Sequence, residues 1–314
     1  MDFLRRIGLS LTTGYIFFFF GERIFWSLPN NPELNTPIDL MATWLVYSFF
    51  AYLCFIIIKQ CRVRSVWAVF LVAALYGWLI EGVFSLTTFG IGSMPFPYSI
   101  VWTALAWHAL CVMGGWYWML QLLQTSTKKV LIGSMLLGIF WGVWSLYWPT
   151  TGLVSTPVNY LVYTLFWTAL YILALHSYHW LSSEIFSATK TEKVILGLIT
   201  LAWYCGFTVT QGGFLLPLTV LPILFGIIYF ALQKNKRKET SPDVLTSINK
   251  RISFKRSVFI LLAPLLATAI FSSGFYFPTN IPYLVTLSTL GIGMFVVSLY
   301  NVFRTKKSSQ GIDK

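Results

Sequence analysis

One stretch decides the fold class, and it runs from Tyr76 to Tyr117: YGWLIEGVFSLTTFGIGSMPFPYSIVWTALAWHALCVMGGWY. A membrane-spanning helix needs about 20 apolar residues, and this stretch offers two such segments joined by a loop rich in glycine and proline. Glu81 and His108 lie inside the apolar segments, where an ionisable group costs several kcal/mol unless it is paired or hydrated. The stretch therefore predicts a pair of membrane helices that carry a candidate functional site.

Composition extends this prediction to the whole chain. Of its 314 residues, 57% are hydrophobic and 10% are charged, whereas a soluble domain has about 25% charged residues. The formal net charge of +12 comes from lysines and arginines in short clusters between apolar segments. Such spacing is a signal of membrane topology, so no nucleic-acid partner is predicted. The four cysteines form no C-x-x-C pair, so neither a disulfide framework nor a zinc site is predicted.

The apolar segments predict an all-α fold, a polytopic integral-membrane bundle of about ten helices. We expect one membrane domain over residues 1–314, with a polar, site-bearing first half (1–150), a more apolar second half (158–307) and a basic loop (234–256). The expected spans are residues 7–28, 38–58, 65–86, 98–121, 130–148, 158–177, 194–212, 214–233, 257–277 and 283–303.

The connectors between these spans alternate in charge. One set is basic, and the other contains no lysine or arginine. Basic connectors stay in the cytoplasm, so the alternation predicts that both termini are cytoplasmic and that the membrane is the plasma (inner) membrane. The loop 234–256 is expected to be a solvated linker or an interfacial segment on anionic lipid headgroups. The basic residues concerned are Arg5, Arg6, Lys59, Arg62, Arg64, Lys128, Lys129, Lys190, Lys193, Lys234 through Arg256, Arg304, Lys306 and Lys307.

Three ionisable residues are the candidate catalytic or proton-carrying groups. With a rise of about 1.5 Å per residue, Glu22 and Glu81 should lie roughly 9 and 7 Å from the outer ends of their helices, and His108 roughly 15 Å into its own. Glu81 and His108 belong to consecutive antiparallel helices and can share a cavity as an acid–base pair. The structural alternative is an interhelical hydrogen bond or ion pair for Glu81, and a neutral, hydrogen-bonded packing residue for His108. Glu22 can instead neutralise Arg23 or reach the interface. The three residues lack the spacings of a metal site, so no metal is predicted.

The candidate substrate-binding residues are Arg23, Trp102, Trp107 and Gln211. Arg23 can pair with Glu81, face an anionic ligand, or extend its long side chain outward to the interface. Trp102 and Trp107 can line a site for a lipid, an isoprenoid or another flat apolar molecule, or they can be packing residues. Gln211 can add a hydrogen bond to the same cavity.

Transport of a small or amphiphilic solute through the buried Glu and His groups is the function that these features favour. The short loops and the absence of a soluble domain in the sequence fit a transporter. An integral-membrane enzyme that acts on a lipid or isoprenoid-like substrate by Glu/His acid–base chemistry is the alternative, and a non-catalytic assembly subunit is the third reading. The lipid bilayer and a small apolar or amphiphilic ligand are the expected partners, and no cofactor is predicted.

Overall fold

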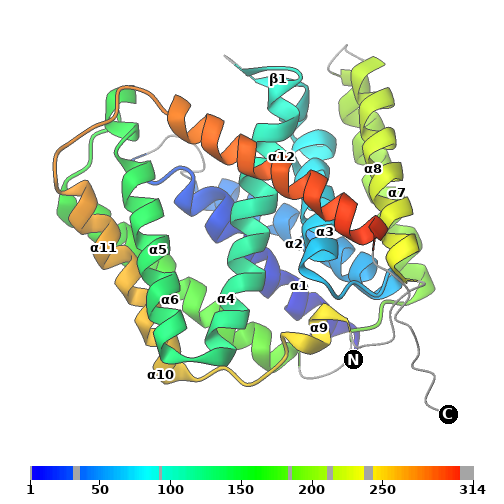
Figure 1. Ribbon diagram of the computed structural model, residues 1–314, viewed down its shortest axis with the longest axis horizontal. Coiled ribbons are helices and arrows are strands. Elements are labelled where there is room, and N and C mark those ends of the chain that lie inside the picture. The colour runs from blue at the N-terminus through cyan, green and yellow to red at the C-terminus, as the bar shows by residue number, and fades with distance from the viewer. Residues whose placement is uncertain are drawn as a thin grey trace. The chain divides into compact units, whose positions relative to one another are not determined.

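The computed structural model describes residues 2–30, 36–91, 94–182, 186–210, 215–236 and 243–304. Within them the fold is all-α apart from one two-residue β-ladder, as Figure 1 shows. The α-helices are α1 (Phe3–Phe18), α2 (Pro37–Gln60), α3 (Val66–Trp78), α4 (Gly114–Thr125), α5 (Thr127–Ser145), α6 (Pro157–Leu181), α7 (Lys190–Thr210), α8 (Leu215–Lys236), α9 (Val244–Ser247), α10 (Phe254–Ser257), α11 (Leu262–Phe271) and α12 (Ile281–Arg304).

Several helices continue with a different hydrogen-bond pattern. Among the described residues, three segments are π-helical: η1 (Phe19–Ile24), η2 (Leu79–Phe84) and η4 (Ile100–Met113). Short 3₁₀ turns are η3 (Thr87–Phe89), η5 (Trp148–Thr151) and η6 (Val258–Leu261). The strands β1 (Gly90–Ile91) and β2 (Met94–Pro95) pair antiparallel. They lie in the loop between η2 and η4, inside the stretch that decides the fold class.

Eight helices of the described chain are long and apolar enough to cross a membrane. They coincide with eight of the ten expected spans. The segments at 7–28 and 130–148 also form helices, as α1 with η1 and as α5, but they are not among the eight. Two lysines in the first turn of α5, and Glu22 and Arg23 in η1, lower the hydropathy of these two segments. The count of ten and the orientation of the termini stay predictions.

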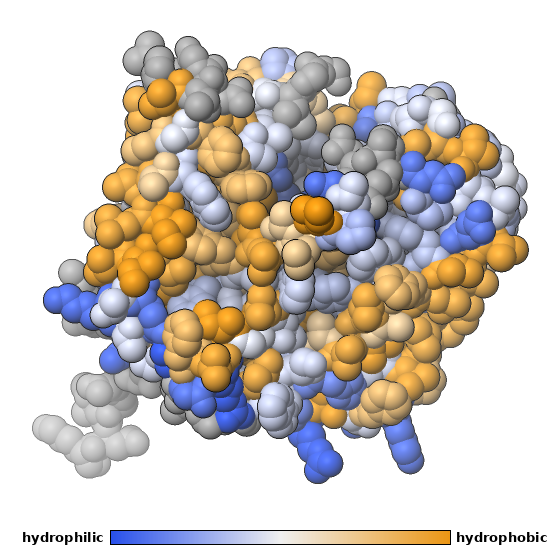
Figure 2. Space-filling view, turned by 180° about the vertical axis from the view of Figure 1, so that it is seen from behind, coloured by the Kyte–Doolittle hydropathy of each residue, from blue (hydrophilic) through white to orange (hydrophobic). Residues whose placement is uncertain are grey.

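Helix α6 shows why lipid is the solvent of this fold. Its exposed residues include Val158, Val162, Phe166 and Leu173. Its buried residues include Thr164, Thr168, three tyrosines and one leucine. The apolar side chains thus face outward and the hydroxyl groups face inward, the reverse of a helix at a water-exposed surface. Broad hydrophobic areas on the molecular face in Figure 2 agree with this pattern. The long apolar helices and their apolar outer faces are compatible with a multi-pass membrane protein.

The chain divides into two compact units that interleave along the sequence. Unit 1 comprises Met1–Tyr52, Leu110–Phe186 and Ile248–Leu287, and unit 2 comprises Leu53–Ala109, Ser187–Ser247 and Ser288–Lys314. The boundaries fall inside α2, η4 and α12. The first half of the sequence therefore contributes to both units.

Small residues set a close helix crossing in unit 1. A Cβ added to Gly138 would lie 2.7 Å from the carbonyl oxygen of Ala263, and one added to Gly142 would lie 2.9 Å from that of Ala267. The two glycines and the two alanines are each four residues apart, so they form facing stripes on α5 and α11. Such small-x-x-x-small stripes allow membrane helices to approach closely, and α5 and α11 lie side by side in Figure 1.

A similar crossing positions the central helices of unit 2. A Cβ on Gly77 would lie 2.4 Å from the carbonyl oxygen of Ala104, so α3 and η4 are in backbone contact there. On another side of η4, a Cβ on Gly291 of α12 would lie 2.9 Å from the amide nitrogen of Ala106. The ring of Trp78 packs against Phe295 of α12, with ring centroids 5.3 Å apart. The helix that carries His108 is thus held between α3 and α12.

The apolar residues of the basic loop 234–256 are mostly inside the protein. Val244, Leu245, Ile248 and Ile252 are buried, and only Phe254 among the loop's larger apolar side chains is strongly exposed. The Val244 amide also donates to the Val63 carbonyl at 2.8 Å. These four side chains therefore do not lie on lipid headgroups, and they differ in this respect from an interfacial segment.

Candidate functional site

The structure brings Glu81 and His108 together in unit 2. The Nδ1 atom of His108 lies 3.3 Å from Oε1 of Glu81, and the exposed fractions of the two side chains are 5% and 14%. The helical hairpin in the sequence indicated that the two residues can share a cavity, but not that Glu22, Glu81 and His108 converge. Because the pair is largely withdrawn from solvent, each group depends on the other and on nearby hydrogen bonds for its polar contacts.

The reason for the contact is the direction in which helical side chains lean. Three contacts show that α3 and η4 run antiparallel. Tyr76 contacts the His108 ring, Gly77 contacts Ala104, and Trp78 Nε1 lies 3.1 Å from the Ile100 carbonyl oxygen. Helical Cα–Cβ bonds tilt towards the N-terminus of their own helix. Glu81 and His108 lie one turn beyond Gly77 and Ala104 respectively, so their side chains lean towards each other.

Both members of the pair lie on π-helical segments, Glu81 on η2 and His108 on η4. A third π segment, η1, carries Glu22 and Arg23. All four ionisable residues singled out from the sequence are thus on π segments, which are rare in proteins and frequently occur at functional sites. Sequence reasoning missed the π-helical geometry, because a helix that is apolar on all sides has no periodicity from which to read its winding.

Hydrogen bonds define which nitrogen of His108 carries a proton. Its Nδ1 lies 2.9 Å from the carbonyl oxygen of Thr103 as well as close to the Glu81 carboxylate. A carbonyl and a carboxylate can only accept, so Nδ1 must be the donor. In the neutral ring the basic lone pair is then on Nε2. This is the orientation of an imidazole whose carboxylate partner holds it in one tautomer.

Two hydroxyl groups complete the surroundings of the Glu81 carboxylate. The Ser85 hydroxyl donates to Oε2 at 3.2 Å, and the Thr87 hydroxyl donates to the same oxygen. Leu86 adopts a left-handed conformation with φ of 58°, which turns the chain at the end of η2 so that both hydroxyls face back to Glu81. The sequence analysis missed Ser85 and Thr87. Their signal is their position directly after the membrane helix, four and six residues beyond Glu81.

The predicted binding residues Trp102 and Trp107 also lie in unit 2, on η4. Both are buried, and their ring centroids are 6.0 Å apart. Neither side chain lines the two cavities described below. A role in ligand binding therefore stays a prediction for these two residues. Gln211 lies outside the described residues.

Glu22 has different partners, all in unit 1. Its Oε1 accepts a hydrogen bond from the Tyr47 hydroxyl at 2.7 Å, and its Oε2 accepts one from the Trp26 ring nitrogen at 2.9 Å. Both carboxylate oxygens are thus occupied by aromatic donors from α2 and from the turn after η1. Gly21 permits this arrangement, because a Cβ there would lie 2.3 Å from the Tyr47 hydroxyl. The Glu22 carboxylate is therefore bound by aromatic donors of unit 1, whereas the side chains of Glu81 and His108 contact each other.

Arg23 is buried between aromatic rings. Its guanidinium carbon lies 5.0 Å from the ring centroids of both Phe18 and Trp167, and the residue is 5% exposed. Cation–π contacts in a desolvated site contribute about 2 kcal/mol or more each. The expectation that Arg23 extends outward to the interface is therefore wrong, because the surrounding rings of α1 and α6 retain it. Within the described chain, its Nε and Nη2 atoms make no hydrogen bond.

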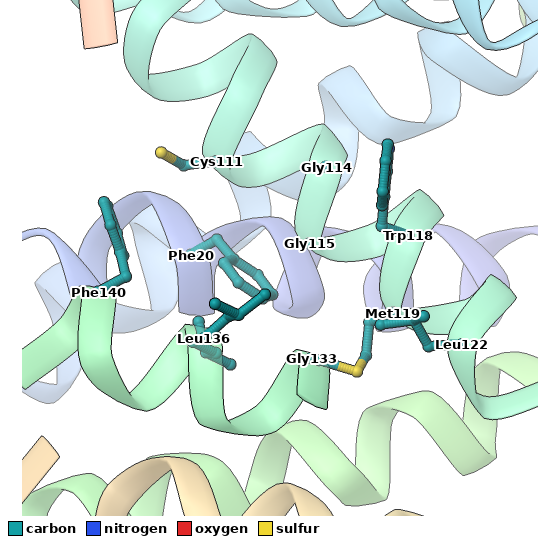
Figure 3. Close-up of a pocket in the computed structure, with 11 residues that line it drawn as sticks. Phe20, Cys111, Gly114, Gly115, Trp118, Met119, Leu122, Gly133, Leu136 and Phe140 are labelled. Carbon is teal, nitrogen blue, oxygen red and sulfur yellow. The ribbon is translucent and has the colours of Figure 1, made fainter. Parts of the chain in front are cut away.

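Two apolar cavities lie apart from these polar groups. The unit 1 pocket has a volume of about 310 Å³ and lies between α4 and α5, as Figure 3 shows. Phe20, Cys111 and three glycines are among its lining residues. The unit 2 groove is larger, about 590 Å³, and is lined by α2, α3, α7 and α8. Leu79 and Val83 of η2 line this groove. Glu81 is two residues from each of them, so its side chain lies on the opposite face of η2 from the groove.

No group of three or more His, Cys, Asp or Glu side chains within the described ranges could hold a metal ion. No family model, curated protein or solved structure matches the chain. The function is therefore inferred from the geometry of the residues.

Proposed function

We propose that the chain is a proton-coupled transporter of a small amphiphilic solute, and that Glu81 and His108 are its proton-carrying pair. The buried contact between these two groups, in a protein with eight apolar helices, is the observation that carries the proposal. Intramembrane Glu and His residues that pair with each other are the usual components of proton relays in transporters. In this proposal Glu22 and Arg23 stabilise helix packing within unit 1 and carry no proton.

Charge explains how the pair could couple proton and solute. With His108 neutral and Glu81 ionised, the pair carries a charge of −1, and one added proton brings it to zero. A neutral pair costs less to bury than a net charge does, so the protonated pair can be closed off from water. The unprotonated pair needs either hydration or a cation beside it. A proton and a cationic amphiphilic solute can therefore compensate the same charge in turn.

Topology completes the proposal. The basic connectors favour an orientation in which both termini and the loop 234–256 are cytoplasmic, and the proposed membrane is the plasma membrane. The loop after η2, with its hydroxyl donors to Glu81, is then at the outer end of the helical hairpin. Solute would reach the pair from this side.

A membrane enzyme is the second candidate, and the tautomer of His108 favours it. A carboxylate that accepts from Nδ1–H leaves Nε2 as a base in a fixed orientation, as an acid–base catalyst requires. In that reading Nε2 would remove a proton from a lipid or isoprenoid-like substrate, and Glu81 would stabilise the resulting imidazolium.

Transport can be tested in vesicles that contain the purified protein. We expect ethidium and tetraphenylphosphonium to enter vesicles with an acidic interior several-fold faster than protein-free vesicles, and to enter at the protein-free rate when no pH gradient is present. Glu81→Gln should abolish the dependence on the gradient, because the amide cannot take up a proton. Asp39→Asn, which alters an exposed carboxylate bonded to Thr36, should leave uptake unchanged.

Infrared difference spectra between acidic and alkaline buffer provide a readout that needs no solute. A carboxylic acid band that appears on acidification in the wild type and is missing in Glu81→Gln would support a proton-carrying pair. Identical spectra for the two proteins would contradict it. Conversion of vesicle lipid by the wild type, detected by mass spectrometry and lost in His108→Phe, would favour the enzyme instead.

A further inference from the structure

The unit 2 groove has the chemistry of a lipid-binding site. Its lining is almost entirely aliphatic and aromatic, and its volume of about 590 Å³ falls within the range of about 300–1,000 Å³ that is usual for small-molecule sites. Helices α7 and α8 form one wall and α2 and α3 the other. The outward faces of α7 and α8 expose apolar residues such as Leu198, Ile223 and Ile227. The hydrocarbon of a bilayer therefore surrounds this groove.

Two glycines keep the groove open. Gly197 of α7 and Gly226 of α8 both line it, and a Cβ added to either would meet no atom within 4 Å. The Tyr204 hydroxyl donates to the Pro217 carbonyl at 2.6 Å, which sets the antiparallel register of α7 and α8. Gly197 and Gly226 consequently lie near the same level on neighbouring helices. These glycines do not serve a close helix crossing, unlike Gly77 or Gly138.

One end of the groove is basic. In the last turn of α8, Lys236 follows the lining residue Leu232 by one helical turn, and Lys190 at the start of α7 precedes the lining residue Gly197 by two turns, at the same end. The Lys234 ammonium instead lies 5.0 Å from the centroid of the Phe303 ring. The Lys59 ammonium is already paired with Asp243 at 2.7 Å. Cys61 lies on the groove wall here, and burial raises the pKa of its thiol while nearby Lys236 acts in the opposite direction. The positive charge of Lys236 therefore lies next to the apolar wall of the groove at Cys61.

We infer that the unit 2 groove binds one acyl chain of an anionic phospholipid, with the phosphate of its headgroup beside Lys190 and Lys236. The apolar lining takes the chain, the two glycines leave the width that it needs, and the lysines neutralise the phosphate. This site is separate from the Glu81–His108 pair, and the inference does not depend on the proposed transport.

The experiment uses the full-length purified protein and native mass spectrometry. The protein is incubated with phosphatidylglycerol or phosphatidylcholine of identical chains, and the retained lipid is measured. We expect the wild type to retain phosphatidylglycerol at least several-fold more than phosphatidylcholine. Gly197→Phe and Gly226→Phe should each lose most retention of both lipids, because a phenyl ring fills the groove. Replacing Lys190 and Lys236 by glutamine should remove the preference for phosphatidylglycerol and keep chain binding.

Gly206→Phe is the matched control. Gly206 is also on α7, its added Cβ also meets nothing within 4 Å, and it does not line the groove, so this variant should retain lipid like the wild type. Unchanged retention in folded Gly197→Phe and Gly226→Phe would overturn the site, and so would equal retention of the two lipids by the wild type. If one glycine variant does not fold, the other tests the chain site and the lysine variant tests the headgroup contact.

Discussion

At the residue scale, different contacts offset the cost of burying each ionisable side chain in the apolar helices. Glu22 accepts from Tyr47 and Trp26, and Arg23 lies between two aromatic rings. Glu81 accepts from an imidazole and two hydroxyls. The Glu81–His108 contact joins a buried carboxylate to an imidazole, two groups that can exchange a proton, and for this reason we single it out.

A double-mutant cycle measures the free energy of interaction between Glu81 and His108. Glu81→Gln places an amide where a carboxylate accepts three donors, and we expect a loss of about 1–3 kcal/mol in the free energy of unfolding. His108→Phe removes the ring donor. Because the two residues touch, their effects should be non-additive by about 0.5–3 kcal/mol. Unfolding of the purified protein by SDS in mixed micelles gives the four free energies.

Asp39→Asn combined with His108→Phe is the reference cycle, since Asp39 is exposed and bonds to Thr36. The two effects should add. A Glu81–His108 cycle that is equally additive would show that the two groups do not interact in the membrane protein as isolated.

At the element scale, two devices position the helices: π-helical segments and small residues at crossings. A π segment widens the helix and shifts the face on which every later side chain lies. Crossings at Gly77, Gly138 and Gly291 then bring backbones together. Without the first crossing, α3 and η4 would be too far apart for Glu81 to reach His108. The polar pair is therefore a consequence of how tightly two apolar helices pack.

Gly→Ala substitutions should have opposite signs at a crossing and away from one. Gly138→Ala puts a Cβ 2.7 Å from a backbone oxygen of α11, and we expect a loss of about 1–3 kcal/mol in stability from overpacking. Gly293→Ala in α12 meets no atom within 4 Å, so the higher helix propensity of alanine should stabilise it by up to about 1 kcal/mol. Thermal unfolding in detergent measures both. Equal shifts in the same direction would contradict the α5–α11 crossing.

At the scale of the whole molecule, the distribution of polarity identifies lipid as the solvent. Helices such as α6 expose valine, leucine and phenylalanine and bury threonine and tyrosine. In water this arrangement would forfeit the hydrophobic effect, whereas in hydrocarbon it loses nothing and satisfies the polar groups inside. The basic connectors predict which side of the membrane each loop occupies.

The orientation can be measured with single cysteines in a background that lacks the exposed Cys205. Thr151 follows α5 in an uncharged connector, and Thr127 begins α5 beside two lysines; both are exposed. We expect Thr151→Cys to react with a membrane-impermeant maleimide in intact cells, and Thr127→Cys to react only after the membrane is permeabilised. The reverse pattern would place the termini outside, and reaction of both in intact cells would contradict a span between them.

The sequence by itself determined that this is an all-α, multi-pass membrane protein and which ionisable residues lie within its helices. It could do so because hydropathy over about 20 residues is a local property. It also indicated that Glu81 and His108 can share a cavity, since consecutive membrane helices are neighbours, whereas their contact was decided by the tertiary structure. Only the tertiary structure decided the π-helical winding, the hydroxyls of Ser85 and Thr87, the aromatic surroundings of Arg23 and the unit 2 groove. These depend on hydrogen-bond register and on contacts between distant segments, and a uniformly apolar helix records neither in its sequence.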